Sequence, residues 1–170
     1  DQLLCEIVLL IQDSFDYDIV EIGLVEGEEL VFKAGVDQGS EAPFQSFRVR
    51  IGREGVTGWV GETGEPLLIP DVSQDERFIQ FSSSGIETRS ELAVPIKTKE
   101  NVVGVLNVQS AEYDAFDESD LVVMQALADQ AATAIENARL FEAEQRRAEQ
   151  FRVISEMGRH ITSILTVDEL

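Results

Sequence analysis

Cysteine is almost absent from this chain: Cys5 is the only one in 170 residues. A single thiol cannot form an intrachain disulfide, and cysteine use of this kind is typical of a reducing, intracellular compartment. We therefore expect a cytoplasmic protein. Cys5 lies in an apolar segment with helical spacing, which predicts an inert core residue rather than a reactive thiol.

Basic residues and long apolar runs are also scarce. The chain has 13 Lys and Arg against 33 Asp and Glu, a net charge of −20. Such a charge repels phosphate backbones and anionic lipid heads, so we expect no nucleic acid partner and no membrane contact. No apolar run approaches the ~20 residues of a membrane span, and nothing resembles a signal peptide. The chain starts at Asp1 rather than Met, which suggests a piece of a longer protein.

The most informative stretch is residues 90–109, SELAVPIKTKENVVGVLNVQ. Two apolar runs rich in β-branched residues flank a polar break at residues 98–101, which predicts a β-hairpin deep in a sheet. Pro95 cannot donate to a ladder, so we expect a bulge there. Gly104 lacks a side chain, so a second backbone is expected to approach it closely.

Other elements surround this hairpin. Residues 1–15 have apolar positions at helical spacing, whereas Ile19 to Glu26 alternate as in a strand. Five glycines spaced three apart follow residue 51, but neither the dinucleotide fingerprint nor the P-loop ending is present. A short helix anchored by Trp59 is the better interpretation. Further strands are expected at residues 30–34, 47–51 and 66–70, and a short helix at 56–62.

A long helix is predicted after Phe116. Asp117 is placed as its N-cap, with Asp120 three residues on as in a capping box, and Phe116 with Leu121 forms a hydrophobic staple. The helical pattern is then unbroken by Gly or Pro to Met157. A helix this long favours a coiled coil or linker over packing on one domain. The expected dimer and relay stripe is Leu121, Met124, Ala128, Ala131, Ile135 and Ala138.

Candidate catalytic and metal motifs fail on their details. His160, the only histidine, is followed by Ile161-Thr162-Ser163, without the acid and proline of a phosphoaccepting histidine. Asp71-x-Ser73-x-Asp75 hints at a calcium loop, but the sixth position is Glu76 where glycine is needed. We therefore expect no catalytic residues, no metal and no cofactor, and the chain is not expected to be an enzyme.

Four segments together resemble the GAF domain family: GVTGWVGETGEPLLIPDV, RSELAVPIK, VVGVLNV and the closing AxQAAxAIENARL helix. The resemblance covers nearly all of residues 1–141, with residues 142–170 left as a signalling or coiled-coil linker helix leading to a further domain. It implies an α+β fold with a central antiparallel sheet of about six strands. The N- and C-terminal helices would cover one face, and short helices and loops would roof a pocket on the other.

The resemblance implies a sensory or regulatory module, non-catalytic, that binds an unidentified small molecule in this pocket. It would pass the signal through the long helix to an output domain of the same polypeptide, such as a histidine kinase or nucleotide cyclase in a two-component or related system. Apolar side chains and a few polar groups, among them arginines suited to an anion, would form the pocket. The candidates are Trp59, Ile69, Asp71, Arg77, Phe78, Phe81, Arg89, Ser90, Leu92 and Val94.

Three alternatives stay open. The aromatic residues could simply fill space while the arginines pair with Glu76, Glu87 or Glu91, leaving a ligand-free dimerisation and relay module. In either case the first and last helices would pair between chains of a parallel homodimer. A cyclic-nucleotide-binding GAF domain is the second alternative, since the Phe116-x3-Asp120 part of that signature is present but its Lys and Glu are not. An enzyme is the third and weakest; the pattern of a GAF-type methionine sulfoxide reductase, which would need several cysteines, is not met.

Overall fold

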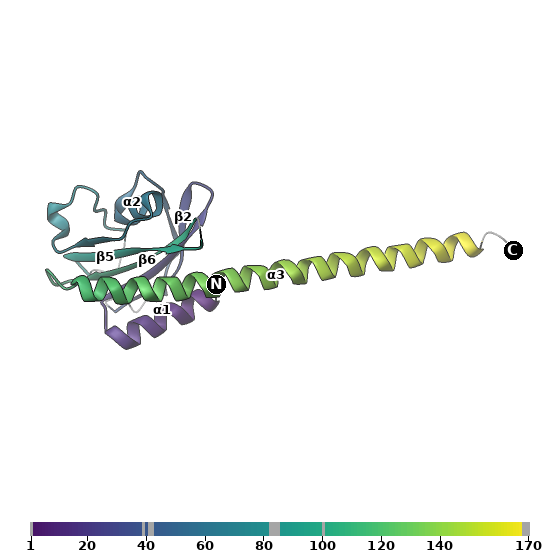
Figure 1. Ribbon diagram of the computed structural model, residues 1–170, viewed down its shortest axis with the longest axis horizontal. Coiled ribbons are helices and arrows are strands. Elements are labelled where there is room, and N and C mark those ends of the chain that lie inside the picture. Colours follow the sequence, from purple (N-terminus) through teal and green to yellow (C-terminus); the bar gives the residue numbers. More distant parts are fainter. Residues whose placement is uncertain (1, 39, 41–42, 82–85, 100, 168–170) are drawn as a thin grey trace. The chain divides into compact units, whose positions relative to one another are not determined.

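The computed structural model describes residues 2–38, 40, 43–81, 86–99 and 101–167, and side chains as far as residue 160 (Figure 1). The chain divides into two compact units, Asp1–Thr133 and Ala134–Leu170. The first unit holds a mixed α+β fold, which confirms the expected class, and the second is helical. The two units are described separately below.

A six-stranded antiparallel sheet forms the centre of the first unit, in the order β3-β2-β1-β6-β5-β4. The predicted hairpin of residues 90–109 is β5 and β6, which both occupy inner positions: β6 lies between β1 and β5, and β5 between β6 and β4. Because both are flanked by other strands and covered on both faces, their sequences are almost continuously apolar. The strands are β1 Ile19–Glu26, β2 Glu29–Asp37, β3 Phe47–Arg50, β4 Leu67–Ile69, β5 Ser90–Lys97 and β6 Val102–Ser110.

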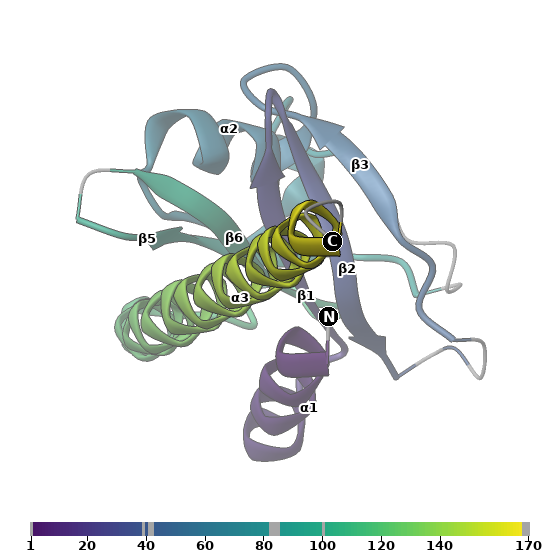
Figure 2. The same cartoon turned by 90° about the vertical axis from the view of Figure 1, so that its right-hand side faces the viewer.

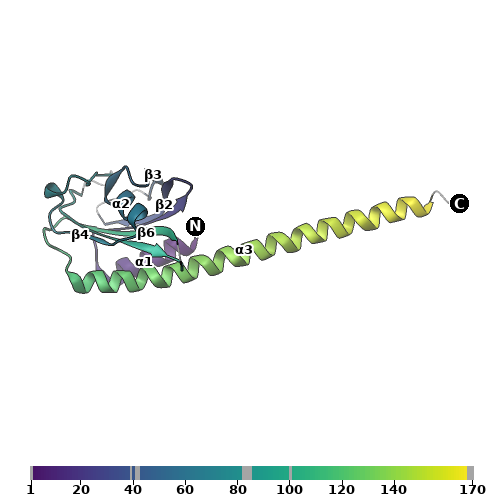
Figure 3. The same cartoon turned by 45° about the horizontal axis from the view of Figure 1, so that its top comes forward.

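Helices cover the two faces of the sheet differently. The N-terminal helix α1 (Gln2–Phe15) lies on one side, together with the first turns of α3 (Glu118–Val167). The short helix α2 (Gly55–Thr63) lies on the other side, as Figures 2 and 3 show. A 3₁₀ turn, η1 (Val72–Gln74), follows β4. The expected arrangement of terminal helices on one face and short elements on the other is confirmed.

The α2 face of the sheet carries its own hydrophobic core. Val56 and Val60 of α2 pack against Leu30, Phe32 and other strand residues, and Trp59 is only half-buried at the edge of this cluster. Glycine lets α2 approach closely: a Cβ on Gly58 would lie 2.7 Å from the backbone oxygen of Arg50. Gly58 and Gly61 therefore serve packing against the sheet, whereas Gly52, Gly55 and Gly64 have positive φ at and around the two ends of α2.

Apolar side chains dominate the face under the terminal helices. Leu4, Val8 and Ile11 of α1 are buried, and so are Met124 and Ala128 of α3. Ala131 is also only 3% exposed, so most of the predicted dimer stripe already belongs to the core of a single chain. These buried members of the stripe are therefore not free for a partner, whereas Leu121 and Ala138 are partly exposed and Leu10 and Val122, outside the stripe, are 65% and 66% exposed.

The start of α3 matches the expected capping box. The Asp117 carboxylate accepts hydrogen bonds from the backbone N–H groups of Ser119 (2.7 Å) and Asp120 (3.1 Å). The Asp120 carboxylate in turn accepts from the Asp117 N–H at 2.8 Å. Phe116 is 2% exposed and meets Tyr17 edge-on, with ring centroids 5.4 Å apart. These reciprocal bonds fix the first residue of the helix.

Two local expectations were wrong. Cys5 is exposed rather than in the core, because the buried stripe of α1 runs through Leu4, Val8 and Ile11 instead. Pro95 is paired in register with Val105, and the irregularity falls two residues later, between Ile96 and Lys97. The Pro95 carbonyl oxygen is used outside the ladder, because it accepts a hydrogen bond from the Gln125 side chain at 3.2 Å.

Gly104 of β6 faces the backbone of β1, as the sequence predicts. A Cβ at Gly104 would lie 2.5 Å from the carbonyl oxygen of Gly23, an atom that cannot move without disturbing the ladder. We expect Gly104→Ala to destabilise the fold by about 1–3 kcal/mol, measured by urea unfolding. Gly158→Ala is the matched control, because a Cβ there meets nothing within 4 Å and alanine favours helix. Equal stability of the two variants would contradict the close contact.

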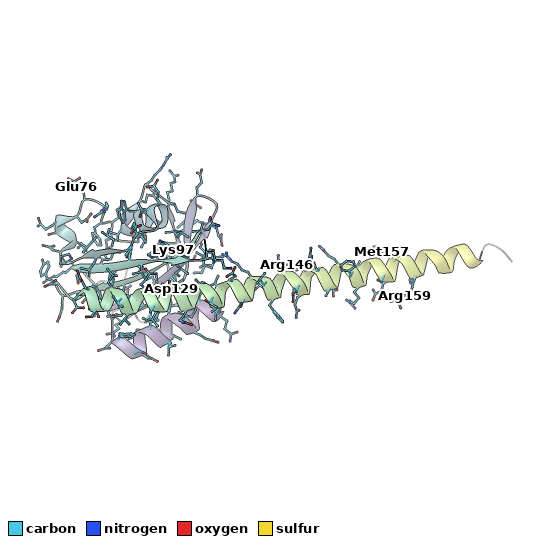
Figure 4. All side chains as sticks on the ribbon, viewed as in Figure 1. Glu76, Lys97, Asp129, Arg146, Met157 and Arg159 are labelled. Carbon is cyan, nitrogen blue, oxygen red and sulfur yellow. The ribbon has the colours of Figure 1, made fainter. Side chains whose placement is uncertain are left out.

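The second unit is the continuation of α3 from Ala134. Between residues 142 and 159 its side chains are exposed, and Figure 4 shows Arg146, Met157 and Arg159 standing out from the helix. Arg152 pairs with Glu149 at 2.7 Å and with Glu156 at 3.7 Å along the surface. Phe151 and Ile154 are 70% and 64% exposed. No helix among the described residues has an apolar stretch able to cross a membrane.

Candidate ligand cavity

Polar side chains interrupt the inner strands at positions that the register brings to one face. Glu21 of β1 is opposite Asn107 of β6, and Gln109 of β6 is opposite Glu91 of β5. Residues directly opposite in an antiparallel pair share a face, and Asn107 is also opposite Ala93, which belongs to the α2-side core. The two carboxyls and two amides therefore gather beneath α2, at the centre of the sheet.

These groups are buried and incompletely paired. Glu21, Glu91 and Asn107 are 5%, 4% and 1% exposed. The Asn107 amide donates to Glu21 Oε2 at 3.3 Å, and the Thr88 hydroxyl to Gln109 Oε1 at 2.6 Å. Among the described residues, Glu91 Oε2 and Asn107 Oδ1 are buried without a hydrogen-bond partner. Buried acceptors without donors are costly, so this site is set up to receive a donor.

Burial changes the ionisation of both carboxyls. Loss of solvent raises the pKa of Glu21 to about 7, against a hydrogen bond from Asn107 that lowers it and a contribution from Asp37 that raises it. Burial raises the pKa of Glu91 to about 8, helped by the charges of Glu21 and Asp75 and opposed by Asn107. The cause in both cases is chiefly desolvation of the charged form. At neutral pH the pair therefore retains protons that surface carboxyls have lost.

A small cavity opens onto this cluster. Its space holds about one water molecule. Aromatic side chains form the wall above the polar floor: Phe32 stacks on Phe47 with centroids 4.6 Å apart, and Phe47 stacks on Phe81 at 5.6 Å. Ile79 and Phe81 are 45% and 36% exposed, so they lie at the mouth. The cavity is lined by Glu21, Phe32, Phe47, Val56, Thr57, Ile79, Phe81, Glu91, Asn107 and Gln109.

Of the ten ligand-binding residues suggested by the sequence, Phe81 alone lines this cavity. Trp59, Ile69 and Phe78 belong to or pack against the α2-side core. The Arg77 guanidinium lies 4.8 Å from the Trp59 ring centroid and bonds to Asp75 at 2.6 and 2.8 Å. The partner of Arg77 is thus Asp75 rather than the glutamates considered above.

Four more of the suggested residues hold loops or pack on the other face. Asp71 caps η1 by accepting from the Ser73 N–H at 3.0 Å and hydroxyl at 2.7 Å. Arg89 is exposed, 5.0 Å from the Tyr113 ring centroid. Leu92 and Val94 alternate with Ala93, which places them on the face that α1 and α3 cover. The expected arginine site for an anion is not assembled at the cavity.

Sequence reasoning missed the polar floor. The signal was present as single polar residues inside apolar strands: Glu21 in IVEIGLV, Glu91 in SELAVPI and Asn107 in VVGVLNV. A charged residue at the centre of a buried strand is unusual and marks a candidate site. No group of three or more potential metal-binding side chains occurs among the residues that the structure describes.

The fold and this cavity define a regulatory domain of the small-molecule-binding kind. The chain belongs to the GAF domain family, whose model matches residues 1–136. It is 33% identical over 122 residues to "GAF domain-containing protein A" of Dictyostelium discoideum, covering 69% of this chain and 69% of that protein. It is 34% identical over 111 residues to "Dual 3',5'-cyclic-AMP and -GMP phosphodiesterase 11" of Drosophila melanogaster.

The chain spans only a small part of some relatives: the phosphodiesterase match covers 63% of this chain but 8% of that protein. Among solved structures, a free methionine-R-sulfoxide reductase of Neisseria meningitidis in complex with its substrate has TM-score 0.71 and 26% identity, covering 82% of this chain and 81% of that one. The GAF domain of a phosphoenolpyruvate-protein phosphotransferase from Coxiella burnetii has TM-score 0.71 and 25% identity, covering 84% and 85%.

Proposed function

We propose that this chain is a non-catalytic sensory module that binds a small molecule at the cavity above Glu21, Glu91 and Asn107. The observation that carries the proposal is the pair of buried, unpartnered acceptors, Glu91 Oε2 and Asn107 Oδ1, in a cavity with a mouth. Buried polar groups are normally paired, so two acceptors without a partner support a site that a ligand completes.

A non-catalytic role agrees with where the only thiol lies. One structural relative is a sulfoxide reductase, and a thiol-based reaction in the cavity would need a cysteine there. Cys5 is exposed on α1, which lies on the opposite side of the sheet from α2, and no thiol lines the cavity. The position of this thiol therefore favours binding over thiol-based redox chemistry.

A cyclic nucleotide is a poorer match to this cavity, although one relative is a cyclic-nucleotide phosphodiesterase. In their ionised form the two carboxyls on the floor would repel a phosphodiester, and among the described residues neither Lys nor Arg lines the cavity to offset this repulsion. In the surviving part of the cyclic-nucleotide signature, Asp120 belongs to the capping box of α3 and Phe116 packs against Tyr17.

The relay is proposed to run through β5. Glu91 faces the cavity, and its neighbour Ser90 donates its hydroxyl to the Glu112 carbonyl at 2.7 Å and accepts from the Ala115 N–H at 3.4 Å. That loop leads directly into α3. Farther along β5, the Pro95 carbonyl accepts from Gln125 of α3. A ligand that shifts β5 would thus shift the first turns of α3.

We propose further that the chain pairs in a parallel homodimer and that it acts on an output domain elsewhere in the polypeptide. Exposed apolar side chains remain on both terminal helices, including Leu10 of α1 and Val122 of α3. In the second unit, Phe151 and Ile154 are exposed at a three-residue spacing that suits a coiled-coil seam. A ligand-free relay would use the same surfaces, so ligand retention is the measurement that separates the two alternatives.

Native mass spectrometry of the purified chain, followed by analysis of a denatured extract, tests the binding proposal. We expect an added mass that disappears on denaturation, or a rise in melting temperature with at least one member of a metabolite panel. A clean mass together with unchanged melting across the panel would instead favour the ligand-free relay module.

Ser90→Ala should separate sensing from relay. The alanine removes both hydrogen bonds to the loop before α3 but leaves the cavity lining intact. We expect ligand affinity to change less than about threefold, whereas ligand-induced protection from hydrogen exchange at residues 118–125 should fall markedly. Equal protection in the variant and the parent would rule out this route.

A further inference from the structure

The polar floor of the cavity is composed of acceptors in need of a donor. The Asn107 N–H₂ group is already used on the carboxyls, so Glu91 Oε2 and Asn107 Oδ1 face the space without a partner. Both side chains are at least nine-tenths buried. Once Glu91 is ionised, its carboxylate and the amide oxygen of Asn107 accept only, so a group that enters this space must then donate, and to more than one oxygen.

The available space limits the size of that donor. Room for about one water molecule excludes a guanidinium or a quaternary ammonium at the floor, but an –NH₃⁺ group is of water size and has three donors. The mouth at Ile79 and Phe81 is apolar and half-open, so the rest of a molecule can extend over the aromatic wall. An ammonium beside aromatic rings also gains from the cation–π attraction.

We propose that the cavity binds the primary ammonium group of a small amine, held by Glu91, Glu21 and Asn107, with its apolar part against Phe47 and Phe81. This inference rests on the proposed binding function and names the class of ligand for the same site. It reverses the expectation from sequence, which placed arginines around an anion.

Charge balance supports a cation here. Two arginines that the sequence had placed at the pocket are used elsewhere: Arg77 is paired with Asp75, and Arg89 is stacked on Tyr113. The carboxyls that act on Glu91 are Glu21 on β1 and Asp75 after η1, and Asp37 at the end of β2 acts on Glu21. All are acidic. An entering ammonium would replace the protons that these carboxyls hold, so binding releases protons and strengthens as pH rises towards about 8.

Benzylammonium chloride tests the proposal on the full chain at about pH 8, where Glu91 is half ionised. Two probes of similar shape serve as controls: benzyl alcohol lacks the charge, and benzyltrimethylammonium has the charge but no N–H. We expect benzylammonium at millimolar concentration to raise the melting temperature and to shift the Asn107 side-chain amide resonances, and neither control to do so. Calorimetry in buffers of different ionisation enthalpy should record proton release.

Variants complete the design. Glu91→Gln should weaken benzylammonium binding by about tenfold or more, because it removes a charged acceptor. Glu28→Gln on the exposed β1–β2 turn should leave it unchanged. The assignment would be overturned if benzylammonium did not change the melting temperature or the Asn107 resonances, or if benzyltrimethylammonium changed them equally. It would also be overturned if Glu91→Gln bound benzylammonium as tightly as the parent. If a retained molecule without an amine is nevertheless found by mass spectrometry, the sensory function stands and only the ligand class is wrong.

Discussion

Glu91→Gln is expected to make the chain more stable than the parent at alkaline pH, with little difference near pH 4.5. Burial raises the pKa of Glu91 from its ordinary 4.5 to about 8, so the folded chain holds a proton that the unfolded chain has released. The protonated Glu91 carboxyl contributes its full stabilisation below the pKa that it has in the unfolded chain. This contribution is lost as the pH rises through the higher pKa that Glu91 has in the folded chain. The glutamine stays uncharged and can donate its amide N–H to Asn107 Oδ1, which lacks a partner.

The size of the effect follows from proton linkage. Between pH 4.5 and about 8 the advantage of the variant should grow by roughly 1.4 kcal/mol per pH unit for one proton, and level off above. Urea unfolding across this range measures it. Glu28→Gln, on an exposed turn, should follow the parent within about 0.5 kcal/mol at every pH. A parallel pH profile for Glu91→Gln and the parent would show that Glu91 ionises normally.

Phe32→Ala should cost about 3–5 kcal/mol of unfolding free energy, a large fraction of the 5–15 kcal/mol of a typical domain. Phe32 is fully buried, stacks on Phe47 and packs over Gly23, where a Cβ would lie 2.9 Å from its ring. Truncation leaves a hole beside the cavity that the strands cannot close. The ring also lines the ligand space, so binding should weaken together with stability.

Two controls keep this result interpretable. Phe141→Ala removes the same side chain from a position that is 62% exposed and should change stability by less than about 0.5 kcal/mol. Phe32→Leu retains much of the volume and should cost clearly less than the alanine, measured by urea unfolding with the same slope m. If Phe32→Ala and Phe141→Ala behaved alike, Phe32 would not be part of the central core.

The fold could be predicted from sequence where local signals agree. The β5–β6 hairpin has two apolar runs and a polar break, α1 has strict helical spacing, and the Asp117 and Asp120 pair marks the start of α3. Each of these was placed within a few residues. Pro95 is an exception to the expectation that a proline in a strand marks a bulge. Pro95 itself is paired in register, its carbonyl oxygen accepts a hydrogen bond from Gln125, and the irregularity lies between Ile96 and Lys97.

The site was harder because it depends on register rather than on composition. Glu21 and Asn107 are 86 residues apart in the sequence and meet only because β1 pairs with β6. Leu92 and Val94 were assigned to the pocket from their hydrophobicity, but alternation along β5 turns them to the helix side. The alanine-rich stripe of α3 was likewise ambiguous. Small residues favour close packing both on the sheet of the same chain and on a helix of a partner chain.

The position of Cys5 has a practical consequence. It is the chain's single thiol, it is exposed, and α1 lies on the far side of the sheet from α2. A fluorophore or spin label attached there needs no prior removal of other cysteines, and the cavity mouth at Ile79 and Phe81 stays clear. Labelled in this way, the unchanged sequence can report movements of α1 while the cavity is titrated.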